Sequence, residues 1–141
     1  MFLCNGAAAG VVKNIVQRTN VIYDMKQDII DFILKTYKAK PEYLWKRYPN
    51  YCVFRHNDNR KWFAIIMTVP RKILKLSGDG NIDVINVKCY TDDTGFLRDI
   101  PGILPAYHMS KANWVSVVLD GTIPLKNIKQ LIQKSFELTQ K

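Results

Sequence analysis

The chain has 141 residues, of which 48% are hydrophobic and 23% charged, and its formal net charge is +9. A chain of this length builds about one compact domain, and this composition is that of a globular protein, which excludes a disordered or a fibrous class. No apolar run reaches the roughly 18 residues that a membrane-spanning helix needs, so we expect no membrane partner.

The positive charge is concentrated between residues 35 and 75. This stretch has eleven basic and two acidic residues (11 − 2 = +9), while the rest of the chain has ten of each and cancels. Such a concentrated field attracts polyanions. The alternative is that these lysines and arginines only keep the surface solvated.

Residues 1–20 are rich in alanine and glycine and have no clean hydrophobic period, so we expect a flexible extension that contributes little to stability. The first helix is predicted to begin at Asp24, because an aspartate followed three residues later by Gln27 resembles a capping box. It ends before Pro41. Its apolar face comprises Met25, Ile29, Phe32, Ile33 and Tyr37.

Residues 41–49 begin and end with proline, which predicts a short helical turn. Residues 51–56 and 62–69 are aromatic and β-branched runs, and the polar residues 57–61 between them indicate a hairpin. Residues 82–89 suit a third strand.

Residues 91–94 are typical of a helix entry, and the pattern favours a brief strand at 104–107 and a strong strand at 114–119. Pro124 opens the last helix, whose inward stripe comprises Leu125, Ile128, Leu131, Ile132, Ser135 and Phe136. This order predicts an α+β fold. An antiparallel sheet of about five strands would carry the N-terminal and C-terminal helices on one face.

Four blocks of the sequence are unusual and occur in a fixed order. They are PEYLWKRYP (41–49), FRHNDNRKWFAI (54–65), NVKCYTDD (86–93) and PGILPAYHMSKANWVSVVLDG (101–121). On these blocks the chain resembles the MmcQ/YjbR-like family of small bacterial proteins. The resemblance covers most of the chain after the N-terminal extension and implies a single domain over residues 21–141 with a frataxin-like fold. It also implies DNA binding through a double wing, without an established reaction or cofactor.

The sequence predicts neither a metal site nor a cofactor. It has two histidines, His56 and His108, and no HxH, HxxxH or HExxH spacing. Frataxin-like proteins use acidic surfaces for iron, but here lysines interrupt the acidic residues of the first helix. The residues concerned are Asp24, Asp28 and Asp31 with Lys26 and Lys35. The three cysteines, Cys4, Cys52 and Cys89, have no disulfide or zinc spacing and fit a reducing cytoplasm.

The turn from His108 to Asn113 gathers polar residues but does not predict an enzyme. Nucleophilic catalysis needs a serine, cysteine or lysine that a nearby base activates. A tight turn also needs polar residues, and we expect Tyr107 and Trp114 to anchor this one in the core. We therefore expect His108 and Lys111 to lie exposed on a structural turn, in a protein that binds and does not catalyse.

Aromatic residues beside basic ones are the stronger indication, since nucleic-acid surfaces combine stacking planes with phosphate contacts. The leading hypothesis is a DNA-binding protein that contacts phosphates without visible sequence specificity. The residues assigned to this role are Lys46, Arg47, Arg55, Arg60, Lys61 and Lys111. The family's proposed mode makes residues 57–61 and 108–113 the candidate wings. Taken singly, each aromatic residue fits a core position equally well.

Two alternatives remain open. One is a pocket for a small anionic ligand, built from Lys88, Tyr107, His108, Lys111 and Trp114. The other is an adaptor whose basic face meets an acidic protein. In each case we expect a cytoplasmic monomer.

Overall fold

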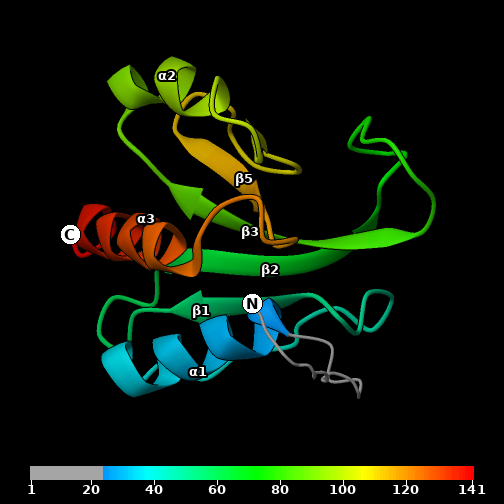
Figure 1. Ribbon diagram of the computed structural model, residues 1–141. Coiled ribbons are helices and arrows are strands. Elements are labelled where there is room, and N and C mark those ends of the chain that lie inside the picture. Colours follow the sequence, from blue (N-terminus) through cyan, green and yellow to red (C-terminus); the bar gives the residue numbers. More distant parts are fainter. Residues whose placement is uncertain (1–23) are drawn as a thin grey trace, which may run out of the picture.

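The computed structural model describes residues 24–141, which form an antiparallel sheet with helices packed on it (Figure 1). The sheet has five strands in the order β1-β2-β3-β5-β4. The strands are β1 (Cys52–Arg55), β2 (Trp62–Pro70), β3 (Asn81–Lys88), β4 (Ile103–Pro105) and β5 (Trp114–Val118). The helices are α1 (Met25–Tyr37), α2 (Thr94–Arg98) and α3 (Leu125–Leu138), and a 3-10 turn, η1 (Thr91–Asp93), leads into α2. The predicted α+β fold is confirmed.

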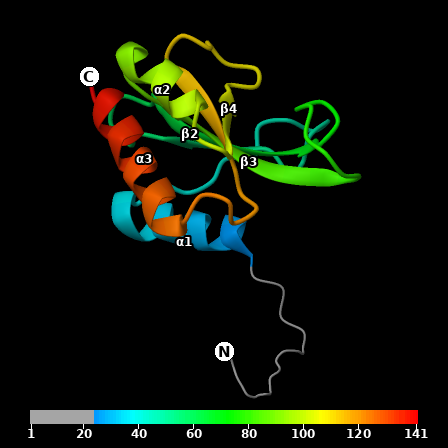
Figure 2. The ribbon, with the colours of Figure 1, turned by 45° about the horizontal axis from the view of Figure 1, so that its top comes forward.

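Helices α1 and α3 lie side by side on one face of the sheet (Figure 2). The start of α1 is as predicted, because the Asp24 carboxylate accepts a hydrogen bond of 3.2 Å from the main-chain N–H of Gln27. The buried residues on the inner side of α1 are Met25, Ile29 and Ile33. Helix α1 therefore packs through the apolar face that its sequence period indicates.

One polar residue on the inner stripe of α3 ties this helix to the sheet. Ser135 is fully buried, and its hydroxyl donates to the carbonyl of Phe63 at 2.6 Å. The same hydroxyl accepts from the N–H of Lys88 at 2.9 Å. The serine thus connects α3 to β2 and β3 and leaves no buried polar group of its own unpaired.

The predicted helical turn over residues 41–49 is wrong. Glu42 instead forms an antiparallel bridge with Val53, with N···O distances of 2.9 and 3.0 Å. The outer edge of β1 would otherwise leave main-chain groups of Val53 unpaired, and this bridge satisfies them. A tight turn follows, closed by a hydrogen bond of 3.2 Å from the N–H of Tyr48 to the carbonyl of Trp45.

The predicted strand over residues 104–107 is also displaced. Strand β4 ends at Pro105, and the N–H of Tyr107 leaves the ladder to bond the hydroxyl of Ser116 at 2.9 Å. The chain after β4 therefore folds over the sheet and does not continue along it.

Among residues 24–141, no helix packs on the second face of the sheet, and loops cover it. Its apolar floor comprises Val53, Ile65, Met67, Val69, Ile82, Val84, Ala106, Trp114 and Val118. Three loops pack on this floor and contribute Trp45 and Tyr51, Leu74 and Leu76, and Tyr107 and Met109. The sheet is thus buried on both faces, although the helices of the described part of the chain lie on one face.

Within residues 24–141, no helix is long and apolar enough to cross a membrane. The extension predicted over residues 1–20 lies outside the described part of the chain.

Candidate functional site

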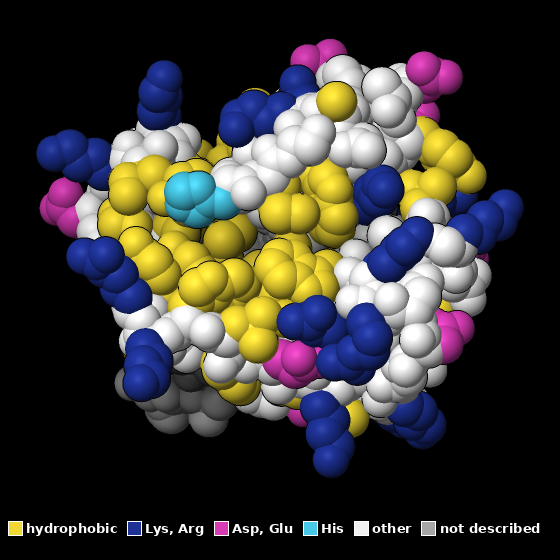
Figure 3. Space-filling model, turned by 180° about the vertical axis from the view of Figure 1, so that it is seen from behind, with side chains coloured by type: hydrophobic (Ala, Val, Ile, Leu, Met, Phe, Trp, Pro, Cys, Tyr) yellow, Lys and Arg dark blue, Asp and Glu magenta, His cyan; other side chains and the backbone are white. Residues whose placement is uncertain are grey.

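The loops on the second face of the sheet leave a pocket of about 320 Å³. Its floor is formed by Ile65, Met67 and Asn86, and its walls are mostly aromatic. The wall residues are Trp45, Tyr48, Tyr51, Trp62, Tyr107, His108 and Met109. Figure 3 views the molecule from behind: hydrophobic side chains line a hollow, a histidine lies at its edge, and lysine and arginine side chains surround it.

One wall is a cluster of four rings that contact one another. Trp45 meets Tyr51 and Trp62 edge to face, with ring centroids 6.1 and 6.0 Å apart. Tyr48 stacks on Tyr51 at 4.7 Å. Such pairs contribute about 0.5–1.5 kcal/mol each beyond the area that they bury. This wall is therefore a packed unit, brought together by the turn at residues 45–48.

The opposite wall belongs to the turn between β4 and β5 and is held by a pair of polar residues beneath it. Asn86 on β3 and Ser116 on β5 lie directly opposite each other in the sheet, and both are fully buried. The Asn86 amide donates to the carbonyl of Tyr107 at 2.8 Å and accepts from the Ser116 hydroxyl. Thr94 donates to the carbonyl of Ala112 at 2.7 Å, which fixes the far end of the turn.

His108 is exposed, as the sequence predicted, and its backbone is left-handed with φ 63°. Its ring centroid lies 3.9 Å from that of Tyr107. A left-handed conformation outside glycine costs about 1–3 kcal/mol and persists only where the surroundings impose it. The hydrogen bonds of Asn86 and Thr94 supply that constraint, so the turn presents the imidazole at the pocket edge.

Three of the six cations assigned to nucleic acid lie on the turns that carry the pocket walls. Lys46 and Arg47 are exposed at the tip of the turn whose two ends, Trp45 and Tyr48, supply rings to the wall. Lys111 is exposed on the turn that carries His108. Each of these two turns therefore carries an exposed cation close in sequence to the residues that line the pocket.

Two further cations are paired with the same carboxylate. Glu42 binds Arg55 at 3.2 Å and Arg60 at 3.0 Å. The Arg55 guanidinium also lies 5.7 Å from the ring centroid of Trp62. The three charged groups together carry 2 − 1 = +1, so two of the six cations have only a share of their charge available for a ligand.

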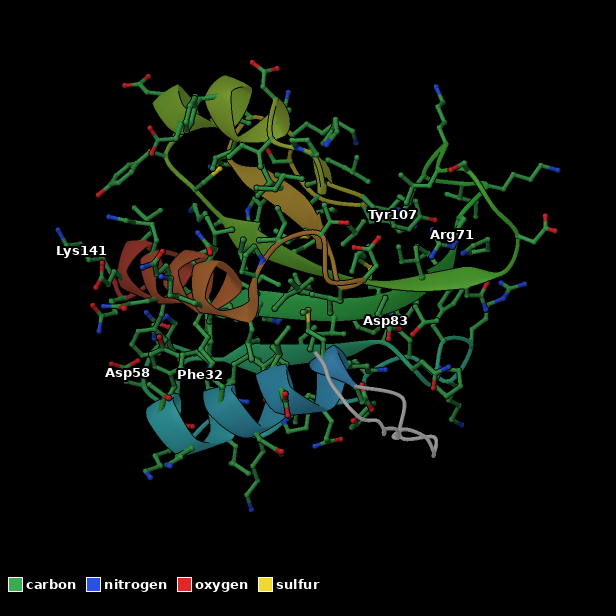
Figure 4. All side chains as sticks on the ribbon, viewed as in Figure 1. Phe32, Asp58, Arg71, Asp83, Tyr107 and Lys141 are labelled. Atoms are coloured by element: carbon green, nitrogen blue, oxygen red, sulfur yellow. The ribbon has the colours of Figure 1, made fainter. Side chains whose placement is uncertain are left out.

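The turn at residues 57–61, which also carries Lys61, does not line the pocket. The Asn57 amide donates to the carbonyl of Lys38 at 3.2 Å, and the Asn59 amide donates to the carbonyl of Thr139 at 2.9 Å. These bonds fix the turn at the C-terminal ends of α1 and α3. Figure 4 shows Asp58 at that end of the molecule and Tyr107 toward the other. The two candidate wings are therefore not parts of one pocket.

The five residues of the alternative ligand site do not all line this pocket, although Lys88 and Trp114 lie directly opposite each other in the sheet. Tyr107 and His108 line the pocket, with Lys111 on the same turn. Trp114 is buried beneath, at 8% exposure. Lys88 lines a separate cavity of about 650 Å³ between α2 and α3. The prediction that Trp114 is buried is confirmed.

The sequence interpretation missed Tyr51, Ile65, Met67, Asn86 and Met109 as pocket residues. One signal was available: Asn86 is the one polar residue in the run Val84–Val87, which is buried in the sheet. A buried asparagine in such a strand indicates a specific hydrogen-bond partner. Here that partner is the main chain of the pocket wall.

Two other titratable groups, His56 and Cys52, are buried in the core. His56 is buried against Phe136, and its Nε2 lies 2.7 Å from the Thr139 hydroxyl. Burial lowers the pKa of His56, although Asp58 opposes the shift. Burial also raises the pKa of the Cys52 thiol to about 11. Among residues 24–141, no three potential ligands are grouped to hold a metal ion.

Comparison with known proteins gives consistent matches. Residues 34–138 match the family model described as YjbR. The chain is 43% identical over 115 residues to the uncharacterised protein YyaQ of Bacillus subtilis strain 168, covering 82% of this chain and 98% of that protein.

Solved structures match as well. The crystal structure of a Pseudomonas syringae protein is 44% identical and has a TM-score of 0.80, over 82% of this chain and 98% of that one. The crystal structure of Deinococcus radiodurans DR2400 has a TM-score of 0.63 at 21% identity, over 82% of this chain and 78% of that one, and it supports the fold alone.

Proposed function

Since the chain belongs to the YjbR family, we propose that it is a DNA-binding protein that acts through the loop-covered face of its sheet and not through the helices. The observation that carries this proposal is the turn at residues 45–48. Its two exposed cations lie between two rings that line a pocket. Phosphate contacts beside a stacking surface are what nucleic-acid-binding proteins use.

The distribution of charge supports this face. Among the described residues, Lys46, Arg47 and Lys111 form no ion pair, and they lie on the two turns that carry the pocket walls. Arg55 adds a further cation above Trp62. A polyanion that crosses the pocket would therefore meet about four positive groups. Arg60 and Lys61 lie farther along the hairpin and are proposed to add weaker contacts at the edge of this surface.

A second candidate is a binding protein for a small anionic ligand in the same pocket. Its volume of about 320 Å³ lies at the lower end of the range of ligand pockets, roughly 300–1,000 Å³. Tyr107 and His108 would supply polar contacts in either case. The two candidates differ in the number of phosphates bound, and salt dependence measures that number. An acidic protein partner for the basic face is the third candidate.

The test is the affinity for a fluorescently labelled random-sequence duplex at 50 and 200 mM salt. With about four phosphate contacts, the slope of log K against log salt is about −3.6, a loss of roughly a hundredfold between these concentrations. Lys46→Gln with Arg47→Gln should weaken binding to all sequences alike and reduce the slope by about 2.

The matched control is Lys126→Gln with Lys141→Gln, which removes the same charge from exposed positions on the helix side of the molecule. This control should leave the affinity nearly unchanged. No binding at low salt would contradict the proposal. Equal losses in both double variants would show that net charge, and not this face, attracts DNA.

A further inference from the structure

We propose that the pocket on the second face of the sheet takes one unpaired nucleobase, so that the protein prefers single-stranded to duplex nucleic acid. This inference rests on the proposed nucleic-acid function and specifies the class of nucleic acid. It depends on the arrangement of the rings, on the charge around them and on the depth at which they lie.

The rings form two separate walls with a space between them. Trp45, Tyr48, Tyr51 and Trp62 contact one another on one side, and Tyr107 and His108 contact each other on the other. Among the described residues, no stacked or edge-to-face pair joins the two walls. The volume of about 320 Å³ between them is lined by side chains of both walls. A flat ring entering this space would find aromatic faces or edges on two sides.

The charge around the pocket excludes the other common occupant of an aromatic cage. Cages of this kind also bind quaternary ammonium groups, which the negative ring faces attract. Among residues 24–141, no acidic residue lines the pocket, and Arg55 already lies over the ring of Trp62. Lys46 and Arg47 stand beside it. This positive field repels a cationic ligand and favours an uncharged ring joined to an anion, which is the chemistry of a nucleotide within a strand.

The polar groups of the pocket point to weak base specificity. Both functional ends of the Asn86 amide are already bonded, to Tyr107 and to Ser116. Recognition would therefore come mainly from stacking, which tolerates every base because every base has a π-face.

The position of the rings favours a single strand. They lie within a hollow of the surface and not on a protruding wedge (Figure 3). A base in a duplex reaches such a hollow only after unpairing and unstacking, which should lower the affinity by about tenfold or more. A base in a flexible single strand avoids most of that cost.

The experiment compares three labelled probes at 50 mM salt: a single-stranded thymidine decamer, the same decamer with abasic sites throughout, and a ten-base-pair duplex. We expect the decamer to bind at least about tenfold more tightly than the other two. Stacking in the pocket should also quench tryptophan fluorescence, because Trp45 and Trp62 line it.

The matched variants are Tyr48→Ala and Tyr48→Phe. Tyr48 is 47% exposed at the end of its turn, so its replacement leaves the core intact. Tyr48→Ala should weaken binding of the decamer about fivefold or more and weaken binding of the duplex by a smaller factor, while Tyr48→Phe keeps the affinity.

Two outcomes would overturn the inference and leave the proposed function standing. They are equal affinities for the decamer and the duplex, and equal affinities for the decamer and the abasic probe. Binding of thymidine monophosphate without binding of any oligomer would overturn both proposals and favour the small-anion alternative.

Discussion

The side-chain amide of Asn86 donates a hydrogen bond of 2.8 Å to the main-chain carbonyl of Tyr107. A residue in the middle of β3 thereby holds one wall of the pocket in place. Because Ser116 bonds both Asn86 and the N–H of Tyr107, the three residues form a closed set of partners. Stability and pocket geometry are therefore coupled through one asparagine.

Asn86→Ala should lower the free energy of unfolding by about 2–4 kcal/mol, because it leaves a carbonyl and a hydroxyl without their partners. Urea unfolding measures this change. The matched control is Asn127→Ala, an exposed asparagine on α3, whose effect should stay within about 0.5 kcal/mol. A midpoint for Asn86→Ala equal to that of the control would show that the turn is held by other contacts.

Trp114 and His108 should differ in the replacements that they tolerate. Trp114→Ala removes a side chain that is 8% exposed and should cost about 3–5 kcal/mol through the cavity that it leaves.

His108 has φ 63°, a conformation that glycine adopts without strain. His108→Gly should therefore be more stable than His108→Ala, although alanine is usually the better residue, and thermal melting would rank the two. The reverse order would contradict the constraint placed on this turn.

Acid should destabilise the protein through His56. Burial lowers its pKa in the folded state, so the unfolded chain takes up a proton first as the pH falls. The free energy of unfolding is not reduced by His56 above the unfolded pKa of about 6.5. Below that pH it declines, by at most about 1.4 kcal/mol per pH unit for one proton. Urea unfolding at pH 7.5 and 5.5 should show this decline, and His56→Gln should reduce it. An unchanged pH dependence in the variant would assign the effect to other groups.

Glu42→Gln should strengthen the binding of DNA. The change leaves Arg55 and Arg60 without the carboxylate that they share, so the surface gains one unit of positive charge. The affinity should rise severalfold at 50 mM salt, and the salt slope should steepen toward −4.5, as for about one further contact. The loss of stability should be less than about 1 kcal/mol per pair, because the pairs are partly exposed. An unchanged affinity would show that neither arginine meets the ligand.

Local patterns predicted the elements of the fold well. Asp24 caps α1 and Pro124 precedes α3, because capping and proline geometry depend on a few neighbouring residues. The hairpin at residues 57–61 was also found, since turn residues separate two apolar runs. Residues 41–49 were misassigned because the deciding contact, between Glu42 and Val53, joins two segments that only the folded sheet brings together.

The candidate site was less predictable for the same reason. Trp45, Trp62 and Tyr107 come from three segments, and no spacing in the sequence reveals that they face one pocket. The charge count treated Arg55 and Arg60 as equivalent to Lys46, whereas folding pairs both arginines with Glu42. Composition predicted the sign of the surface charge. Only the packing showed which of its charges are available.

The sequence of strand β4 limits how a second copy of the protein could pair with this edge of the sheet. At this margin of the sheet, the N–H of Ile103 is already bonded to the carbonyl of Ile100 at 3.0 Å. Two residues later, on the same side of the ladder, Pro105 has no N–H to offer. At the opposite margin, Val53 is bonded to Glu42. A second copy therefore finds few donors with which to prolong the sheet, and growth of cross-β fibres would first require these margins to unfold.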